Sequence, residues 1–198
     1  MLWTKFVIVA ISAMLLCGQA SAGDMTFPRT SEEFVSALKF KDGAIKHRGL
    51  QYKVQDGRIY KVIKGKRYRI RGLAGIDRIE ESPIVPKAGA LVTFSSNSDN
   101  IKPQSLRLLD EFAKALKGEL SGAKVVVAGH TDEQGADQYN LNLSQKRSQA
   151  VMNYLVQNYG IDAKRLVVKA YGERKPIATN GSEQGRRLNR RVEFIRVE

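Results

Sequence analysis

Asp132 and Arg147 are the two residues of this sequence whose types and spacing best suggest binding chemistry. Asp132 follows an apolar run, Lys124–Ala128, that is typical of a β-strand, so we expect its carboxylate at the end of a strand. Arg147 falls in the first turns of the helical pattern that comes next. A carboxylate and a guanidinium placed in this way can bind the two opposite charges of one zwitterion. The pair therefore predicts a ligand pocket between a strand end and a helix.

The same part of the sequence allows two other interpretations. Asp132 and Arg147 could form an ordinary ion pair with no ligand, and such pairs contribute only about 0–1 kcal/mol when exposed. His130 and Ser144 lie near Asp132 and suggest a hydrolytic triad, but no nucleophile-elbow sequence surrounds Ser144. The chain also lacks the H-E-x-x-H and phosphate-loop motifs. We therefore expect a binding protein rather than an enzyme, with no cofactor and no metal.

The elements that must position these residues belong to a second region of the chain, residues 91–198. Apolar periodicity predicts strands at 91–94, 124–128, 165–170 and 191–197, one helix that starts at Pro103 and another that ends at Tyr159. Gly160 is the expected cap of the second helix, and Gly129 and Gly135 are expected in turns. The order βαβαββ predicts an α/β sandwich in which helices cover a mixed sheet.

Residues 23–82 form a smaller predicted region, joined to the sandwich by an extended linker at 83–90 that contains two prolines. Thr30 and Glu33 have the spacing of a capping box at the start of a short helix. Alternating apolar residues then predict a strand on each side of an Asp-Gly turn at 56–57, followed by one further strand. The predicted fold class is α/β, with a small basic α+β or β-hairpin region ahead of the mixed-sheet sandwich.

One face of these predicted strands is strongly basic. Between residues 39 and 71 the sequence has twelve lysines and arginines and only two acids. Lys53, Arg67, Arg69 and Arg71 should lie on the same side of the strands, because alternate residues share a face. This face could bind a polyanion, or it could be a solvated surface that discourages edge-to-edge pairing of sheets. The sequence leaves both interpretations open.

Residues 1–22 have the pattern of a cleavable secretory signal peptide. Lys5 precedes an apolar run, and an A-x-A cleavage pattern ends at Ala22. An uncleaved anchor and a lipoprotein cut before Cys17 are the alternatives, and the large residue before Cys17 disfavours the second. We expect export to the periplasm, either free or associated with the outer membrane. Cleavage after Ala22 would leave a mature chain without cysteine and therefore without disulfides.

The chain is basic overall, with a formal net charge of +13 and a pI near 9.9. A cytosolic protein with this charge would suggest a nucleic-acid partner. Because we expect export, we predict no nucleic acid and look instead to the cell envelope. An anionic envelope component or an outer-membrane protein is the expected partner of the basic region.

Five motifs in the second region carry a family resemblance. In chain order they are GHTDEQG, YNLNLSQKRSQAV, GIDAKRL, AYGERKPIATN and GRRLNRRVEF. Together they make residues 90–198 resemble the OmpA-like peptidoglycan-binding domain, which is shared by the C-terminal part of OmpA, Pal lipoproteins and MotB-type stator proteins. The resemblance implies the same sandwich fold and a structural role for His130.

The resemblance also implies a ligand, the diaminopimelate of the peptidoglycan peptide stem. The family's acid, which binds the ammonium, matches Asp132, and the arginine that binds the carboxylate matches Arg147. Further ligand contacts carry over to Asn97, Thr131, Asn140 and Arg191, the last of which lines or supports the pocket.

Three reservations accompany these residues. Asn140 could instead cap a helix. Asn189 and Arg190 are expected to tie the last strand to a loop rather than to bind ligand. Ser95 and Ser96 stand where many relatives have an acid, which puts the contacts of the Asn97 loop in doubt.

The function expected from these observations is non-covalent binding of peptidoglycan through its diaminopimelate, as an anchor or tether in the Gram-negative periplasm or at the outer membrane. The alternative is an envelope adaptor. In that case the basic region would bind a protein partner or lipopolysaccharide, and wall binding would be secondary.

Overall fold

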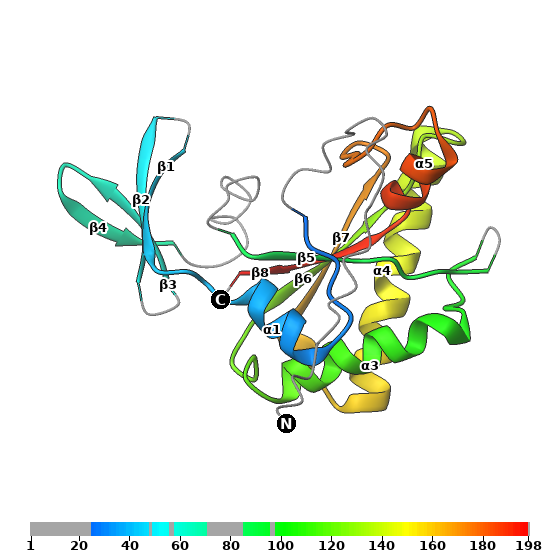
Figure 1. Ribbon diagram of the computed structural model, residues 1–198, viewed down its shortest axis with the longest axis horizontal. Coiled ribbons are helices and arrows are strands. Elements are labelled where there is room, and N and C mark those ends of the chain that lie inside the picture. The colour runs from blue at the N-terminus through cyan, green and yellow to red at the C-terminus, as the bar shows by residue number, and fades with distance from the viewer. Residues whose placement is uncertain (1–24, 48, 56–57, 71–84, 96–97, 198) are drawn as a thin grey trace, which may run out of the picture.

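The structure is a computed structural model that describes residues 25–47, 49–55, 58–70, 85–95 and 98–197 (Figure 1). The predicted signal peptide at 1–22 and the candidate residue Asn97 lie outside the described residues, as do Arg71 and the Asp-Gly turn at 56–57. No helix in the described part of the chain is long and apolar enough to span a membrane.

A four-stranded mixed sheet forms the centre of the molecule, in the order β5-β8-β6-β7. Its strands are β5 (Lys87–Ala90), β6 (Val125–His130), β7 (Leu166–Gly172) and β8 (Val192–Arg196). β8 runs antiparallel to both of its neighbours, whereas β6 and β7 are parallel and are connected by helix α4 (Asp137–Tyr159). This arrangement confirms the predicted mixed α/β sheet.

Helices cover one face of this sheet (Figure 1). They are α1 (Ser31–Leu38), α3 (Pro103–Lys117) and α4, and α1 begins with Thr30 capping the amide of Glu33, as the sequence predicted. Phe34 of α1 packs against Phe112 of α3 and Phe194 of β8, with ring centroids 5.0 and 6.0 Å away. Helix α1 therefore contributes to the core of the sandwich, although it precedes the small sheet in the chain.

A second, smaller sheet lies beyond the other face of the central sheet (Figure 1). It is an antiparallel meander of β1 (Gly43–His47), β2 (Leu50–Gln55), β3 (Arg58–Ile63) and β4 (Lys66–Arg69). Tyr52, Val54 and Ile59 point to one side and form a single apolar cluster with Val126 and Ile195 of the central sheet. This cluster fixes which face of the small sheet is turned outward.

Two predicted boundaries are wrong. Part of the expected linker at 83–90 is strand β5, whereas the expected strand at 91–94 has only an isolated bridge between Phe94 and Ile101. The small residues of β5 suit its surroundings, because a Cβ on Gly89 would collide with the ring of Phe27. Their low β-propensity hid the strand from sequence patterns.

The predicted order βαβαββ also missed one short helix, α5 (Glu183–Asn189), which lies between β7 and β8 in the structure. The Ser182 hydroxyl caps it by accepting a hydrogen bond from the Gly185 amide. A further single turn of 3-10 helix, Ala163–Arg165, precedes β7.

Candidate functional site

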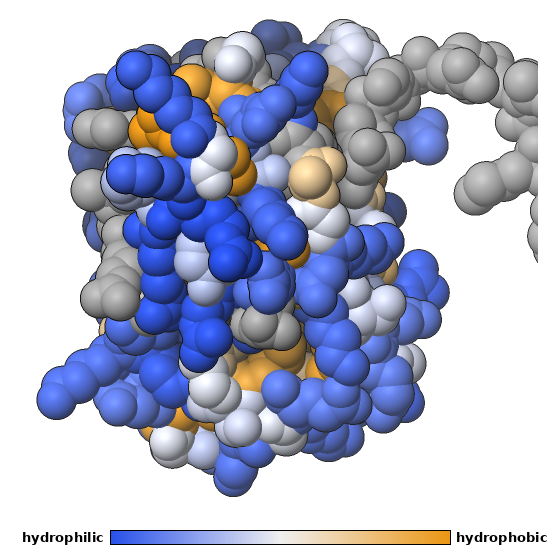
Figure 2. Space-filling view, turned by 90° about the vertical axis from the view of Figure 1, so that its left-hand side faces the viewer, coloured by the Kyte–Doolittle hydropathy of each residue, from blue (hydrophilic) through white to orange (hydrophobic). Residues whose placement is uncertain are grey.

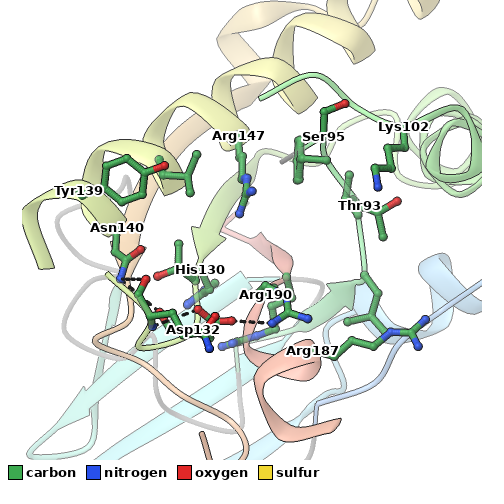
Figure 3. Close-up of a pocket in the computed structure, with 17 residues that line it drawn as sticks. Thr93, Ser95, Lys102, His130, Asp132, Tyr139, Asn140, Arg147, Arg187 and Arg190 are labelled. Carbon is green, nitrogen blue, oxygen red and sulfur yellow. Dashed lines mark hydrogen bonds and ion pairs between the residues drawn. The ribbon is translucent and has the colours of Figure 1, made fainter. Parts of the chain in front are cut away.

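A cavity of about 480 Å³ opens where the carboxyl end of β6 meets α4, α5 and the segment that follows β5 (Figure 3). This size is within the range of ligand pockets. The side chains that give it a charged or polar lining are Thr93, Ser95, Lys102, His130, Thr131, Asp132, Gln134, Tyr139, Asn140, Arg147, Arg187, Arg190 and Arg191. Asp132 is the only acid among these lining residues, so the cavity is predominantly basic.

Asp132 stands at the end of β6, as predicted, and backbone contacts fix its loop. The Thr131 amide donates to the Gly172 carbonyl at 2.9 Å, and the Asp132 carboxylate accepts the Gln134 amide at 3.2 Å. The buried Asn140 side chain donates to the carbonyl of Gln134 at 3.1 Å and, more weakly, to that of Asp132 at 3.4 Å. The Asp132 carboxylate is therefore held in place before any ligand arrives.

Asn140 therefore supports the loop of Asp132. It is not the helix cap that we considered, because the cap position of α4 is Ala136. Its amide also donates to the carboxylate of Glu173 at 2.7 Å, which links the loop after β6 to the end of β7. The Asn140 side chain lines the cavity, is buried, and uses its amide group in these hydrogen bonds.

Gly129 sets the distance between β6 and α4. It lies inside strand β6 rather than in the turn we expected, and a Cβ there would collide with the Ser144 carbonyl oxygen and the Ser148 hydroxyl. The helix can therefore approach the strand closely. Because Asp132 follows this strand and Arg147 lies on this helix, the close approach brings both side chains to one cavity. Gly135, by contrast, has a φ of 107° in the loop before α4, as predicted.

Arg147 points into the cavity from α4, on the side opposite Asp132 (Figure 3). Its Nε donates to the Ser98 carbonyl at 3.3 Å, and its guanidinium lies over the Phe94 ring at 4.9 Å. Burial lowers the pKa of Arg147 from its usual value, and the nearby Tyr139 and Asp132 oppose that shift. No ion pair joins Arg147 to Asp132 in the described part of the chain, so the simple ion-pair interpretation is wrong.

Arg190 is the residue that pairs with Asp132. Its guanidinium contacts the Asp132 carboxylate at 2.6 Å and the Glu183 carboxylate of α5, also at 2.6 Å (Figure 3). As expected, Arg190 links the start of the last strand to a loop, but this loop is the one that carries Asp132. Asn189 behaves as predicted, because its side chain bonds the backbone of Ile177 and Ala178.

Arg191 supports the pocket floor from a buried position. Its guanidinium donates to the Glu193 carboxylate and to the carbonyl of Lys175, the latter at 3.0 Å. His130 lies beside them, with Nε2 3.3 Å from Glu193. Burial, together with the positive charges of Arg191, Lys175 and Lys87, lowers the pKa of His130 to about 2. The imidazole is therefore neutral, and it stacks on Tyr171 with centroids 5.1 Å apart.

Two hydroxyl groups near the cavity differ in their hydrogen bonding. The Thr131 hydroxyl is buried and has no hydrogen-bond partner within the described residues, although Thr131 lines the cavity. The Ser144 hydroxyl donates to the Leu141 carbonyl at 2.8 Å and accepts from the Gly172 amide at 3.0 Å. Ser144 is engaged by backbone and fully buried, which argues against the hydrolytic triad. The described residues also contain no group of acids, histidines or cysteines that could hold a metal.

The structure thus brings five of the six candidate residues to one cavity: Thr131, Asp132, Asn140, Arg147 and Arg191. Three basic residues were missed as site residues, namely Lys102, Arg187 and Arg190. The run of arginines in the GRRLNRR segment was the available signal for two of them.

Comparisons with known proteins agree with this fold. The OmpA family model matches residues 93–190. The peptidoglycan-associated lipoprotein of Pseudomonas aeruginosa is 45% identical over 101 residues, which are 51% of this chain and 58% of that protein. The chain therefore spans little more than half of that relative.

Two solved structures are similar as well. The peptidoglycan-associated lipoprotein of Burkholderia pseudomallei is 31% identical, with 53% of this chain and 87% of that chain covered and a TM-score of 0.48. The periplasmic domain of Helicobacter pylori MotB is 26% identical, with 56% and 81% covered and a TM-score of 0.51. The motifs, the mixed sheet and the family match together show that residues 93–190 form an OmpA family domain.

Proposed function

We propose that this protein binds peptidoglycan non-covalently, through the free end of the diaminopimelate in its peptide stem. The observation that carries the proposal is the placement of Asp132 and Arg147 on opposite sides of one cavity, without an ion pair between them. The free end of diaminopimelate has an ammonium and a carboxylate on one carbon. Asp132 would bind the ammonium, and Arg147 would bind the carboxylate with two parallel hydrogen bonds.

The excess of positive charge in the cavity fits the rest of the stem. Lys102, Arg187 and Arg190 accompany Arg147 in the lining, whereas Asp132 is the only acid among the described residues that line it. A peptide stem has further carboxylates and only one free ammonium at diaminopimelate, so its charge is complementary to this lining. Binding of the ammonium would compete with Arg190 for Asp132, and Glu183 would retain Arg190 nearby.

The names of the relatives support the same ligand class. The Pseudomonas and Burkholderia relatives are both called peptidoglycan-associated lipoproteins. We infer that this protein acts in the Gram-negative envelope, on its periplasmic side, as a binding protein without catalytic activity. The buried, engaged hydroxyl of Ser144 supports the absence of catalysis.

Co-sedimentation with purified sacculi tests the proposal. Asp132→Ala and Arg147→Ala should each abolish most of the binding, because each leaves one ligand charge without its partner. Asp137→Ala and Arg174→Ala are matched controls. They remove an exposed ion pair of 2.7 Å that does not line the cavity, and they should sediment as wild type does. If the two pocket variants sediment as well as the two controls, the proposed site is wrong.

A further inference from the structure

Strand β4 and the turn before it form an exposed basic edge of the small sheet. We define the basic edge as residues 63–69, with the sequence IKGKRYR, and every residue in it is exposed. It contains four cations, Lys64, Lys66, Arg67 and Arg69, and no acid. Among the described strands, β4 is the outer one of its sheet and pairs with β3 alone.

The outward face of the small sheet extends this charge. In the observed register, Lys53 pairs with Tyr60 and Tyr60 pairs with Arg69, so these side chains lie in one row. Lys46 and Arg67 lie in the adjacent row, which confirms the basic face predicted from alternation. Tyr52 and Val54 point to the opposite, buried side, so the basic face is turned away from the central sheet.

Exposed apolar side chains are concentrated along the basic edge. Leu50, Ile63, Tyr68 and Tyr139 are the large hydrophobic residues exposed in the described chain. Ile63 and Tyr68 belong to the basic edge and are 43% and 52% exposed. In the observed register they share the side of Lys66, whereas Arg67 and Arg69 are on the outward face, so cations and apolar side chains meet along the edge strand rather than on one face. Leu50 lies at the same end of the sheet. Figure 2 shows this side of the molecule covered by hydrophilic side chains, with small apolar patches among them.

From this juxtaposition we propose that the basic edge docks onto an anionic lipid surface. Lysine and arginine would contact lipid phosphates, while Ile63 and Tyr68 enter the boundary between headgroups and acyl chains. Positive charge alone would suit any polyanion, but exposed apolar side chains among the cations favour a lipid surface. Apart from Arg67, which contacts Gln55 and Tyr60, no partner of these cations is found in the described residues.

The basic edge and the ligand cavity lie in different parts of the molecule (Figure 1). The cavity is formed by the central sheet with α4 and α5, whereas the basic edge belongs to the small sheet. Lipid docking therefore does not depend on the proposed wall binding. If both occur, one protein can hold a membrane surface and the cell wall at once.

Vesicle co-sedimentation of the whole mature chain tests this proposal. Vesicles of phosphatidylglycerol mixed with phosphatidylcholine should bind the protein, and vesicles of phosphatidylcholine alone should not. The variant Lys64→Gln/Lys66→Gln/Arg69→Gln should lower the partition coefficient roughly 100-fold, since each basic residue near an anionic surface contributes about fivefold. Arg107→Gln/Lys117→Gln/Lys164→Gln is the matched control. It removes the same charge from exposed positions elsewhere and should lower binding much less.

A second variant separates lipid docking from general attraction to anions. Ile63→Ser/Tyr68→Ser keeps the charge and should lower vesicle binding several-fold, with a deficit that persists in high salt. Equal binding by the basic-edge and control variants would overturn the proposal. The cations would then be explained by their second role, which is to discourage pairing of the edge strand with another sheet. Unchanged binding of Ile63→Ser/Tyr68→Ser would overturn the lipid assignment in favour of a soluble polyanion. All variants should still sediment with sacculi, so failure here leaves the proposed wall binding standing.

Discussion

The ligand cavity and the basic edge are both rich in positive charge, but they hold that charge in different ways. In the cavity, Asp132 pairs with Arg190, and Arg191 pairs with Glu193, so the groups are partly buried and fixed. At the basic edge, Lys64, Lys66 and Arg69 are exposed, and none has an ion-pair partner among the described residues. A fixed set of charges suits one small ligand of defined shape, whereas exposed flexible charges suit a surface without a single geometry. The following predictions test that contrast.

Removal of Arg147 should have the largest effect on the cavity. Arg147→Ala should weaken binding of a diaminopimelate-containing stem peptide by about 2–5 kcal/mol, because the ligand carboxylate loses its partner in a partly desolvated site. Arg147→Lys should restore only part of this loss, since an ammonium cannot make the two parallel hydrogen bonds. Isothermal titration calorimetry measures both variants. Full affinity in Arg147→Lys would mean that only charge, and not geometry, matters in the cavity.

Gly129→Ala should damage the cavity indirectly. The added methyl would push α4 away from β6, and overpacking of this kind costs about 1–3 kcal/mol of unfolding free energy. Stem affinity should fall as well, because Arg147 moves with the helix. Gly122→Ala is the matched control, since a Cβ there meets no atom within 4 Å. Urea unfolding and calorimetry give the two quantities. A Gly129→Ala protein with unchanged stability would contradict the observed close approach.

His130 should make folding stability depend on pH. Its folded pKa of about 2 lies below the usual 6.5, so below pH 6.5 the unfolded state binds the extra proton. Stability should therefore fall as pH falls through that window, by at most about 1.4 kcal/mol per pH unit from this one group. Urea unfolding of wild type and His130→Gln between pH 7 and pH 5 should show a shallower slope for the variant. Identical slopes would show that the pKa of His130 does not change on folding, and would contradict its burial as a neutral imidazole.

A change in salt concentration should affect ligand binding in the cavity least of all these perturbations, and it should affect the basic edge more. Raising the salt concentration from 0.15 M to 1 M shortens the Debye length from about 8 Å to about 3 Å. Stem binding in the cavity should weaken only a few-fold, while vesicle binding by the basic edge should weaken more than about tenfold. Calorimetry and vesicle co-sedimentation in the same buffers make the comparison. Equal salt dependence would remove the distinction between fixed and exposed charge.

Local patterns in the sequence were sufficient for part of this architecture. The strand before Asp132 and the glycine cap at Gly160 can each be predicted from a few neighbouring residues. Both are observed, as β6 and as a φ of 63° at Gly160. The pairing of Asp132 with Arg190 could not be predicted, because it depends on how α5 and β8 pack against the loop after β6. Strand β5 was missed for a similar reason, since its small residues become a strand only through pairing with β8.

The same limit applies to the first part of the chain. Alternation of side chains placed Lys53, Arg67 and Arg69 on one face, and the register of the small sheet agrees. No local pattern indicated that Phe34 packs against Phe112 and Phe194 in the core of the other region. Helix packing partners are set by the whole fold, and a single amphipathic helix can satisfy its apolar face against many surfaces.

Calorimetric titration with two stem peptides tests the central claim most directly. One peptide contains meso-diaminopimelate, and the other contains lysine at the same position and so lacks the carboxylate that Arg147 would bind. We predict measurable binding of the diaminopimelate peptide and at least tenfold weaker binding of the lysine peptide, a difference of about 1.4 kcal/mol or more. Arg147→Ala should remove this preference. Equal affinity of the wild-type protein for the two peptides would contradict the account.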